Sequence, residues 1–376
     1  MKRILAMDGG GIRGVYTLQI LARIEEIFRE ERGEPGLVLR DVYDLFAGTS
    51  TGAIIATFLA WGLPVREIEK LYIDHSPDMF ATGSWHERWK YKYKPEALAG
   101  FLREHFIDPA TGAPALLGSS HLKDKLLLIV MRDGSSGGSW PLTNNPLAVY
   151  NRPDHPGNNL NFPIWQLLRA STAAPTYFPP EEIEVGGKTH LFMDGGMTPY
   201  NNPALIAAFM ATLPRYHIGW PATREELHVT SVGTGLVRAH IAGKAASSLN
   251  ILDYARYMAP ALLGAIAWQQ DLACRIIGDC VHGGALDSEI GALEMPTLFN
   301  AGEQKFTYAR YDQPFDERDS KIAALAPNIF ELDNLKMIPA LQALGCEYAA
   351  AHVRREHLYP RGPGFTPCAC SVTTTR

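Results

Sequence analysis

The feature that most constrains the fold is a strand, a glycine turn and a helix, which occur together twice near the start of the chain. Residues 3–7 form a short apolar run, and the segment DGGGIRG follows at residues 8–14. Residues 15–32 then have the apolar spacing of an amphipathic helix. Residues 42–62 repeat this order, with an apolar run, a turn of small residues and an apolar helix that ends at a glycine.

The rest of the chain continues the alternation of strands and helices. Residues 125–133 and 226–235 read as further strands, and residues 247–277 and 335–356 as helices. Strands that alternate with helices favour a mostly parallel sheet with helices on both faces. We therefore expect a three-layer α/β/α fold.

No repeat, low-complexity linker or block of like charges divides the 376 residues. We expect a single domain with insertions over residues 1–356, with a motif-bearing core at 3–235 and a helical part at about 236–356. Residues 357–376 are predicted to be a flexible tail. The segment at 132–163 is dense in glycine, proline and asparagine, which predicts a stretch that is largely loop.

Composition and hydropathy narrow the classes of function. A formal net charge of −5 argues against a nucleic-acid-binding protein, which usually carries a basic face. The N-terminus has too few apolar residues before Asp8 for a signal peptide. The longest weakly polar stretch, residues 258–268, is much shorter than the roughly 20 residues that a membrane-spanning helix needs. We therefore expect a soluble, cytoplasmic protein.

The glycine run at residues 9–14 matches the G-x-G-x-x-G pattern of dinucleotide-binding folds. In such folds an acidic residue about 20 positions further on reaches the ribose from the end of a second strand. Glu30 and Glu31 lie near that distance, but at the end of the predicted helix, where they cannot face a ribose. The glycine spacing therefore agrees with a nucleotide-binding oxidoreductase, but the position of the acidic residues does not.

A second motif, GTSTG, lies at residues 48–52 between a predicted strand and a predicted helix. This G-x-S-x-G pattern in this context is typical of a nucleophile elbow, a tight turn that exposes the serine, here Ser50. The start of the following helix favours negative charge at the same place. The later histidines, His282, His352 and His357, have no surroundings that resemble a catalytic triad.

A third motif supplies an acid in place of a histidine. In the segment LFMDGGMTPYNNP, an apolar strand leads to Asp194 and a glycine turn at residues 195–196. Taken alone, this motif could be an ordinary Asp-Gly turn.

The three motifs together, in this order, resemble the patatin-like phospholipases. The segments ASTAAPTYFPP at 170–180, NNP at 201–203 and SVGTG at 231–235 are also similar to segments of that family. The resemblance covers roughly residues 3–235 and is weaker to about residue 356. It implies a lipid acyl hydrolase, a serine esterase that needs neither a metal nor another cofactor.

The resemblance also implies a role for each motif. Ser50 would be the nucleophile and Asp194 the base that takes its proton, a Ser-Asp dyad. The oxyanion hole would be formed by the N–H groups of Gly10 and Gly11, with Gly9 or Ile12 as further donors, and Arg13 would either add positive potential or fix the loop. The remaining motif glycines are Gly14, Gly48, Gly52, Gly195 and Gly196.

Elementary chemistry agrees with glycine at the oxyanion hole. Donors must lie about 2.7–3.1 Å from the developing oxyanion, so the backbone must approach without a Cβ atom in the way. A carboxylate is a weaker base than an imidazole, with a reference pKa of about 3.9 against about 6.5. The dyad therefore needs a short contact and little water.

The expected partners are a lipid or acyl-ester substrate and no nucleic acid. Residues 80–93 interleave aromatic and basic side chains, which favours either transient contact with a membrane surface or an ordinary cover over the sheet with a basic rim. A second hypothesis is a patatin-like effector whose main role is regulatory, switched on by a nucleotide signal or another activator. Residues 235–319 lie outside the motifs and could hold such a switch or a contact between copies of the chain.

Overall fold

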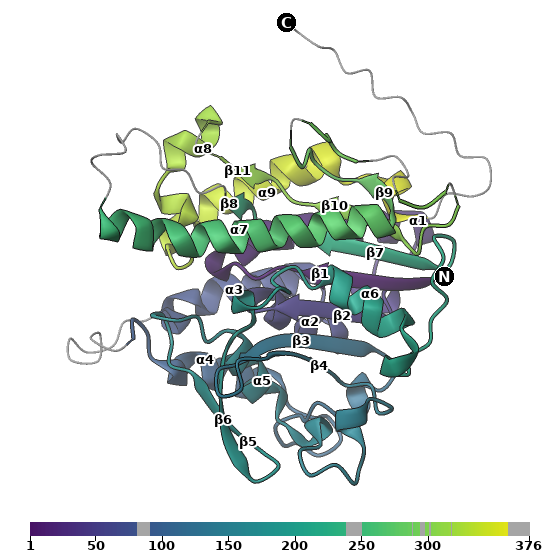
Figure 1. Ribbon diagram of the computed structural model, residues 1–376, viewed down its shortest axis with the longest axis vertical. Helices are drawn as coiled ribbons and strands as arrows, with labels where there is room; N and C mark the ends of the chain where they lie inside the picture. Colours follow the sequence, from purple (N-terminus) through teal and green to yellow (C-terminus); the bar gives the residue numbers. More distant parts are fainter. Residues whose placement is uncertain are drawn as a thin grey trace, which may run out of the picture.

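The computed structural model describes residues 1–80, 91–237, 250–287, 289–293, 298–300, 302–316 and 318–359. A central sheet lies between two layers of helices (Figure 1). Six neighbouring strands of this sheet run parallel, in the order β3-β2-β1-β7-β10-β9. The predicted α/β/α class with a mostly parallel sheet is confirmed.

In the described part of the chain the main sheet has nine strands, and β4, β5 and β6 form its antiparallel side. Two short strands, β8 and β11, pair separately. The bounds are β1 (Lys2–Met7), β2 (Leu45–Thr49), β3 (Leu126–Asp133), β4 (Ser139–Thr143), β5 (Glu181–Val185), β6 (Lys188–Asp194), β7 (Leu227–Val232), β8 (Leu236–Val237), β9 (Asp279–His282), β10 (Thr307–Tyr311) and β11 (Pro314–Phe315).

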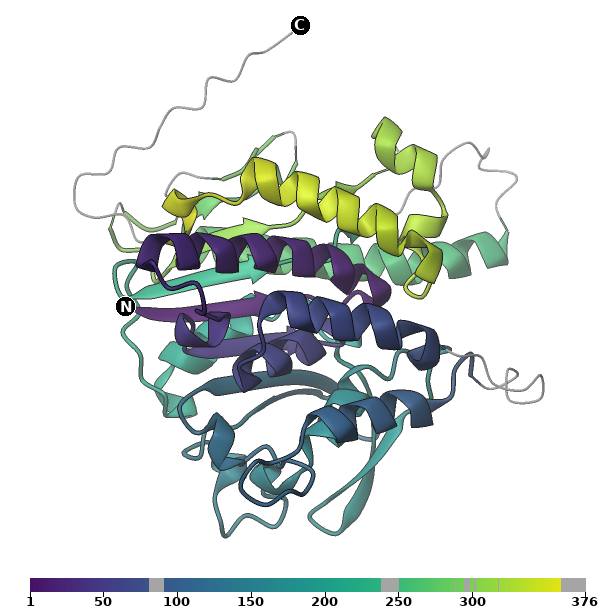
Figure 2. The same cartoon turned by 180° about the vertical axis from the view of Figure 1, so that it is seen from behind.

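The two faces of the sheet are covered by different sets of helices. On one face lie α1 (Gly14–Arg32), α2 (Thr51–Trp61), α3 (Val65–Met79), α4 (Pro95–His105), α5 (Ile164–Ser171) and α9 (Ile338–His352). Figure 2 shows this face, with α1 between α9 and α3. On the other face lie α6 (Ala204–Thr212) and α7 (Ile251–Ile277). The short helices α8 (Ser320–Leu325) and α10 (Arg355–Leu358) follow late in the chain.

The strands are apolar on both sides because both faces of the sheet are buried. In β1, Leu5 and Met7 face the core under α1 and α2, while Ile4 and Ala6 face the core under α6. All four side chains are fully buried. The period of two along the strand thus serves two separate cores.

The strand register brings the three sequence motifs to one edge of the sheet. Met7, the last residue of β1, pairs with Gly48 in β2 and with Val232 in β7. Asp194, the last residue of β6, pairs with Met131 in the antiparallel direction. Residues that follow the carboxyl ends of parallel strands are the usual place for ligands in such sheets.

Several local predictions differ from the structure. The segment 132–163, predicted to be largely loop, also contains β4, which pairs with β3 in the antiparallel direction. The helix predicted at 335–356 begins as a 3-10 turn, and α9 ends at His352, where Val353 adopts an extended backbone. Leu358, placed in the predicted tail, is fully buried, while residues 360–376 lie outside the described residues. None of the described helices combines the length and apolar character needed to cross a membrane.

Candidate active site

Ser50 lies in the turn between β2 and α2, and its backbone is strained. Its φ of 54° and ψ of −125° are unusual for a residue with a side chain, as expected for a nucleophile elbow. The N–H of Ser50 donates to Ser171 Oγ at 2.9 Å, and Ser171 Oγ donates to the carbonyl of Val130 at 2.7 Å. A buried side chain from α5 thus holds the turn from below.

Glycines around the turn are required by the close approach of backbone to backbone. A Cβ atom on Gly48 would lie 2.2 Å from the carbonyl oxygen of Gly52. A Cβ atom on Gly52 would lie 2.3 Å from the carbonyl oxygen of Met7, and one on Gly195 would lie 2.2 Å from that of Val130. Gly48 and Gly52 therefore allow the start of α2 to pack closely on β2 and β1, and Gly195 allows the turn after β6 to pack closely on β3.

Asp194 lies directly beside Ser50, although 144 positions separate them in the sequence. Ser50 Oγ donates to Asp194 Oδ2 at 2.7 Å, and the N–H of Gly196 donates to Asp194 Oδ1 at 2.7 Å. Both side chains are buried, with 9% of Ser50 and 6% of Asp194 exposed. Burial raises the pKa of Asp194 to about 6, although the hydrogen bonds and the nearby Arg169 oppose the shift.

The backbone N–H groups of the glycine loop divide into two pairs. The outer pair is already bonded: Gly9 donates to the carbonyl of Asn201 at 3.3 Å, and Ile12 donates to the carbonyl of Leu332 at 2.7 Å. The inner pair, at Gly10 and Gly11, has no acceptor within the described residues. Of the donors expected from the sequence, only the inner pair is therefore available to a ligand.

Glycine is also required at the two inner positions. A Cβ atom on Gly10 would lie 2.2 Å from Thr234 Oγ1, and one on Gly11 would lie 2.2 Å from the carbonyl oxygen of Leu332. Gly11 also has a positive φ of 58°, which side chains other than glycine rarely adopt. The loop thus packs tightly between the segments that contain Thr234 and Leu332, and no side chain covers the N–H groups of Gly10 and Gly11 from their own positions.

Arg13 and Gly14 complete the motif at the start of α1. The Arg13 side chain is buried and donates from Nη1 to the carbonyl of Phe330 at 3.4 Å, while burial lowers its pKa to about 10. Of the two roles expected for Arg13, this hydrogen bond favours fixing the loop, because it ties the loop to a distant segment. A Cβ atom on Gly14 would lie 2.8 Å from Thr51 Oγ1, so Gly14 permits close packing of α1 on the elbow.

Tyr72 in α3 connects the elbow to the glycine loop, and sequence reasoning missed it. Its hydroxyl donates to the carbonyl of Gly11 at 2.7 Å and lies 2.7 Å from Thr51 Oγ1, which then donates to it. Burial raises the pKa of Tyr72 to about 12, so the hydroxyl keeps its proton. Nothing in the sequence around Tyr72 distinguishes it from other apolar-face residues of an amphipathic helix. Ser171, in contrast, lies within the segment 170–180 that the resemblance already singled out.

The three late histidines lie together, and none of them forms a hydrogen bond with Ser50 or Asp194. The rings of His282 and His357 stack with centroids 4.4 Å apart, and that of His352 is 5.8 Å from His282. Burial lowers the pKa of His282 to about 3. No histidine among the described residues bonds Ser50 or Asp194, and no cluster of histidine, cysteine and acidic side chains there could hold a metal ion.

The aromatic and basic segment at 80–93 is described only at its ends. Residues 81–90, with Trp85 and Trp89, lie outside the described residues. The rings of Phe80 and Tyr93 pack against each other with centroids 5.4 Å apart, and the Tyr93 hydroxyl donates to Asp333. Membrane contact by this segment stays a prediction.

Comparisons with a family model and with curated proteins all match this chain to patatin-like proteins and phospholipases. The family model described as patatin-like phospholipase matches residues 5–208, which hold all three motifs. The chain is 28% identical over 243 residues to a cGAMP-activated phospholipase of Escherichia coli, with 62% of each chain covered. It is 29% identical over 251 residues to patatin-like protein 4 of Arabidopsis thaliana, covering 62% of this chain and 59% of the relative.

A mammalian relative matches over a smaller share of its length. Calcium-independent phospholipase A2-gamma of Rattus norvegicus is 30% identical over 248 residues, covering 62% of this chain and 28% of the relative. The chain thus matches less than two thirds of the length of each of these three relatives.

Proposed function

The chain belongs to the patatin-like phospholipase family, and on that premise we propose that it hydrolyses carboxylic ester bonds of lipids, with Ser50 as nucleophile and Asp194 as general base. The observation on which this proposal depends is the 2.7 Å hydrogen bond from Ser50 Oγ to Asp194 Oδ2. A base must lie within hydrogen-bond reach of the proton it removes, and this pair meets that condition.

In the first half of the reaction Ser50 Oγ attacks the acyl carbonyl carbon while its proton passes to Asp194 Oδ2. The carbonyl oxygen becomes an oxyanion that accepts hydrogen bonds from the N–H groups of Gly10 and Gly11. Collapse of this intermediate releases the alcohol, which takes the proton from Asp194, and leaves an acyl-serine. A water molecule, with Asp194 again as base, then releases the fatty acid and restores Ser50.

The environment of Asp194 compensates for the weakness of a carboxylate as a base. With its pKa raised to about 6 by burial, Asp194 is close in basicity to an imidazole, whose reference pKa is about 6.5. At neutral pH most of the carboxylate remains ionised. The N–H of Gly196 holds the other oxygen, which leaves Oδ2 facing the nucleophile.

The glycine loop supplies the electrostatic part of catalysis. Two amides that have no other partner in the described chain are preorganised for an anion, and the N-terminus of α2 adds favourable potential. Loss of one such donor typically costs a factor of about 10² to 10³ in kcat. Together the dyad and the loop form a set of groups suited to acyl transfer.

The test is hydrolysis of a panel of short-chain and long-chain acyl esters, with and without phospholipid head groups, by the wild type and Ser50→Ala. We expect the wild type to be active and the variant to lose activity, with preserved thermal stability. Ser120→Ala is a matched control, because Ser120 is exposed and precedes β3 at the opposite edge of the sheet. Substantial ester hydrolysis by Ser50→Ala would contradict the proposal.

A regulated form of the same activity is the second candidate. It is favoured by the relative of Escherichia coli that is named a cGAMP-activated phospholipase. The panel is therefore run with and without cGAMP. Activity that requires the nucleotide supports the regulated form, and equal activity in its absence favours a constitutive lipase.

A further inference from the structure

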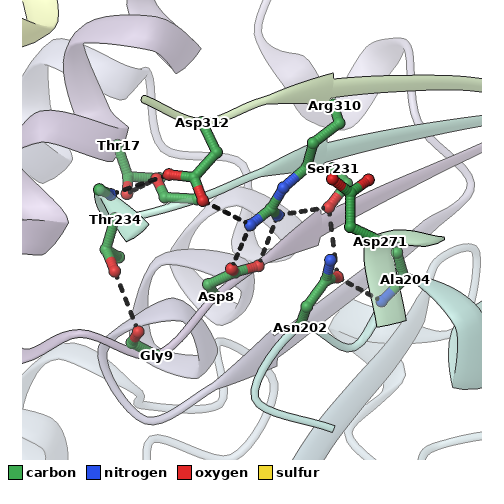
Figure 3. A network of polar contacts seen from close by, with 12 residues as sticks. Asp8, Gly9, Thr17, Asn202, Ala204, Ser231, Thr234, Asp271, Arg310 and Asp312 are labelled. Carbon is green, nitrogen blue, oxygen red and sulfur yellow. Dashed lines mark hydrogen bonds and ion pairs between the residues drawn. The ribbon is translucent and has the colours of Figure 1, made fainter. Parts of the chain in front are cut away.

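Asp8 begins the glycine loop and is held by an arginine from the far end of the sequence. Arg310, in β10, donates from Nη1 to Asp8 Oδ1 at 2.9 Å and from Nη2 to Asp8 Oδ2 at 2.6 Å (Figure 3). Both side chains are almost fully buried, with 3% of each exposed. The residue that immediately precedes the catalytic glycines is thus fixed at two points.

Arg310 also reaches the segment that follows Asp194. Its Nη1 donates to Ser231 Oγ at 2.8 Å, and Ser231 Oγ donates to Asn202 Oδ1 at 3.2 Å. Asn202 Oδ1 also accepts from the N–H of Ala204 at 3.0 Å (Figure 3). The carbonyl of the preceding residue, Asn201, accepts from the N–H of Gly9. One guanidinium therefore connects the glycine loop with the chain that leaves the acid of the dyad.

A second branch of the same network supports the loop through the turn after β7. Arg310 Nη2 donates to Asp312 Oδ2 at 2.8 Å, and Asp312 Oδ1 accepts from the N–H of Gly235 at 2.9 Å. In the same turn, Thr234 Oγ1 donates to the carbonyl of Gly9 at 3.0 Å (Figure 3). This turn is the one that presses on Gly10 and excludes a side chain there.

Arg310 forms ion pairs with Asp8 and Asp312 and with no other carboxylate of the described residues. A third carboxylate, Asp271, is bonded by Arg275 at 3.0 and 2.7 Å and by the hydroxyl of Tyr308 at 3.1 Å. Among the described residues, Arg310 is the only side chain that forms an ion pair with Asp8 or Asp312, and both carboxylates are buried. Its replacement by a neutral side chain leaves both carboxylates without an ion-pair partner in the described part of the chain, a situation that proteins tolerate poorly.

We propose that Arg310 is a positioning residue for ester hydrolysis, which holds the glycine loop through Asp8 so that the Gly10 and Gly11 amides face the oxyanion. The inference rests on the proposed function. Arg310 lies outside residues 5–208, so it extends the machinery of the site into the part of the chain that the family model does not match. Arg310 touches no reacting atom and acts on the transition state only through the loop.

The test is a double-mutant cycle with Asp8→Asn, Arg310→Gln and the double variant, assayed on the best ester of the panel. Small displacements of oriented groups cost large factors in rate, so each single variant is expected to lower kcat by about 10- to 100-fold. KM should stay within about twofold, because the loop binds the oxyanion and not the ground-state ester. Since the effect of Asp8 on the loop is proposed to depend on its contact with Arg310, the double variant should be no slower than the slower single variant.

Two further variants separate positioning from general stability. Arg310→Lys keeps the charge and should recover part of kcat. Glu25→Gln is the matched control: Glu25 is a buried carboxylate that Arg29 bonds at 2.6 Å within α1, and its replacement should leave kcat unchanged. If Arg310→Gln does not fold, Asp8→Asn and Arg310→Lys still carry the comparison.

Amide hydrogen exchange on the same proteins measures how firmly the glycine loop is held, without the need for enzyme activity. The N–H groups of Gly9 and Ile12 are bonded in the native loop, so a peptide over residues 8–14 should exchange faster in Asp8→Asn than in wild type and Glu25→Gln. A wild type that is inactive on every ester, both with and without cGAMP, refutes the proposed function, and exchange alone then decides whether the loop is anchored. Unchanged exchange, unchanged kcat, strictly additive losses or an effect on KM alone would each overturn the positioning role.

Discussion

The chain contains the sequence Asp-Gly-Gly at two places, residues 8–10 and 194–196, and the two copies carry different chemistry. Asp8 directly follows β1 and Asp194 is the last residue of β6, and both buried carboxylates lie at the same edge of the sheet. Burial raises the pKa of both Asp8 and Asp194 to about 6. The difference lies in the partner: a guanidinium for Asp8, and a serine hydroxyl with a backbone amide for Asp194.

A raised pKa alone therefore does not identify a catalytic base. Asp8 binds a cation that cannot give up a proton near neutral pH, so its carboxylate can only hold the loop in place. Asp194 binds a hydroxyl whose proton it can accept. In the proposed mechanism Asp194 therefore takes part in proton transfer, while Asp8 holds the glycine loop in position.

The largest expected effect comes from Asp194→Asn, which keeps the shape of the side chain and removes the base. Loss of general-base catalysis lowers kcat by about 10² to 10⁴, and we expect a value toward the upper end, because no histidine of the described chain can replace the acid. Steady-state kinetics with a chromogenic ester and circular dichroism of the variant provide the measurement.

The matched control for this variant is Asp133→Asn. Asp133 is buried at the end of β3, where it accepts hydrogen bonds from Ser136 and His190. Its replacement should leave kcat within about twofold, since it touches neither motif. Substantial turnover by Asp194→Asn, or an equal loss in Asp133→Asn, would remove the distinction between the two copies of Asp-Gly-Gly.

The next effect is on the pH dependence of kcat. Asp194 acts as a base only when ionised, so kcat should rise with pH through about 6, and at pH 5 it should be about tenfold below its plateau. Burial raises the pKa of Asp8 as well, so the wild-type profile alone cannot show which of the two carboxylates causes the rise of kcat with pH. This rise should persist in Asp8→Asn, with a lower kcat at the plateau. Its disappearance in that variant would reverse the two roles.

The smallest effect is on stability, where the two copies should behave alike. Each carboxylate has a folded-state pKa of about 6, above the unfolded value of about 3.9, so the folded state binds more protons between these values. Stability should therefore fall as pH rises from about 4 to about 6, by on the order of 1–3 kcal/mol for Asp194 and in the same direction for Asp8. Thermal unfolding of Ser50→Ala at pH 4 and pH 7 measures the total.

Replacement of either aspartate by asparagine in the Ser50→Ala background should remove part of this fall. The two aspartates should thus affect the pH dependence of stability in the same direction, while kcat should fall much further in Asp194→Asn than in Asp8→Asn. A fall that neither substitution reduces would place the titration in other groups.

Local pattern in the sequence predicts the part of the site that depends on local structure. The apolar run before Asp8, the turn at Ser50 and the strand before Asp194 each follow from periodicity and glycine placement within about ten residues. The fold class follows from the alternation of these units. These predictions could be made because the determining residues are neighbours in the chain.

The contacts that complete the site could not be predicted in this way. Asp8 and Arg310 are 302 positions apart and meet only because β1, β7 and β10 are adjacent in the sheet. Tyr72 looks like any buried residue of α3 until α3 is packed against the elbow. Such pairings depend on strand order and helix packing, which local periodicity does not specify.

The hydroxyl of Tyr72 has one more consequence. A single phenolic oxygen contacts both Thr51, the residue after the proposed nucleophile, and the carbonyl of Gly11, so it fixes the spacing between the turn at Ser50 and the glycine loop. Any rigid shift of α3 would stretch that spacing at both ends at once. Substitutions along this helix, although they remove no reacting group, should therefore alter turnover more readily than equally buried changes in α6 or α7.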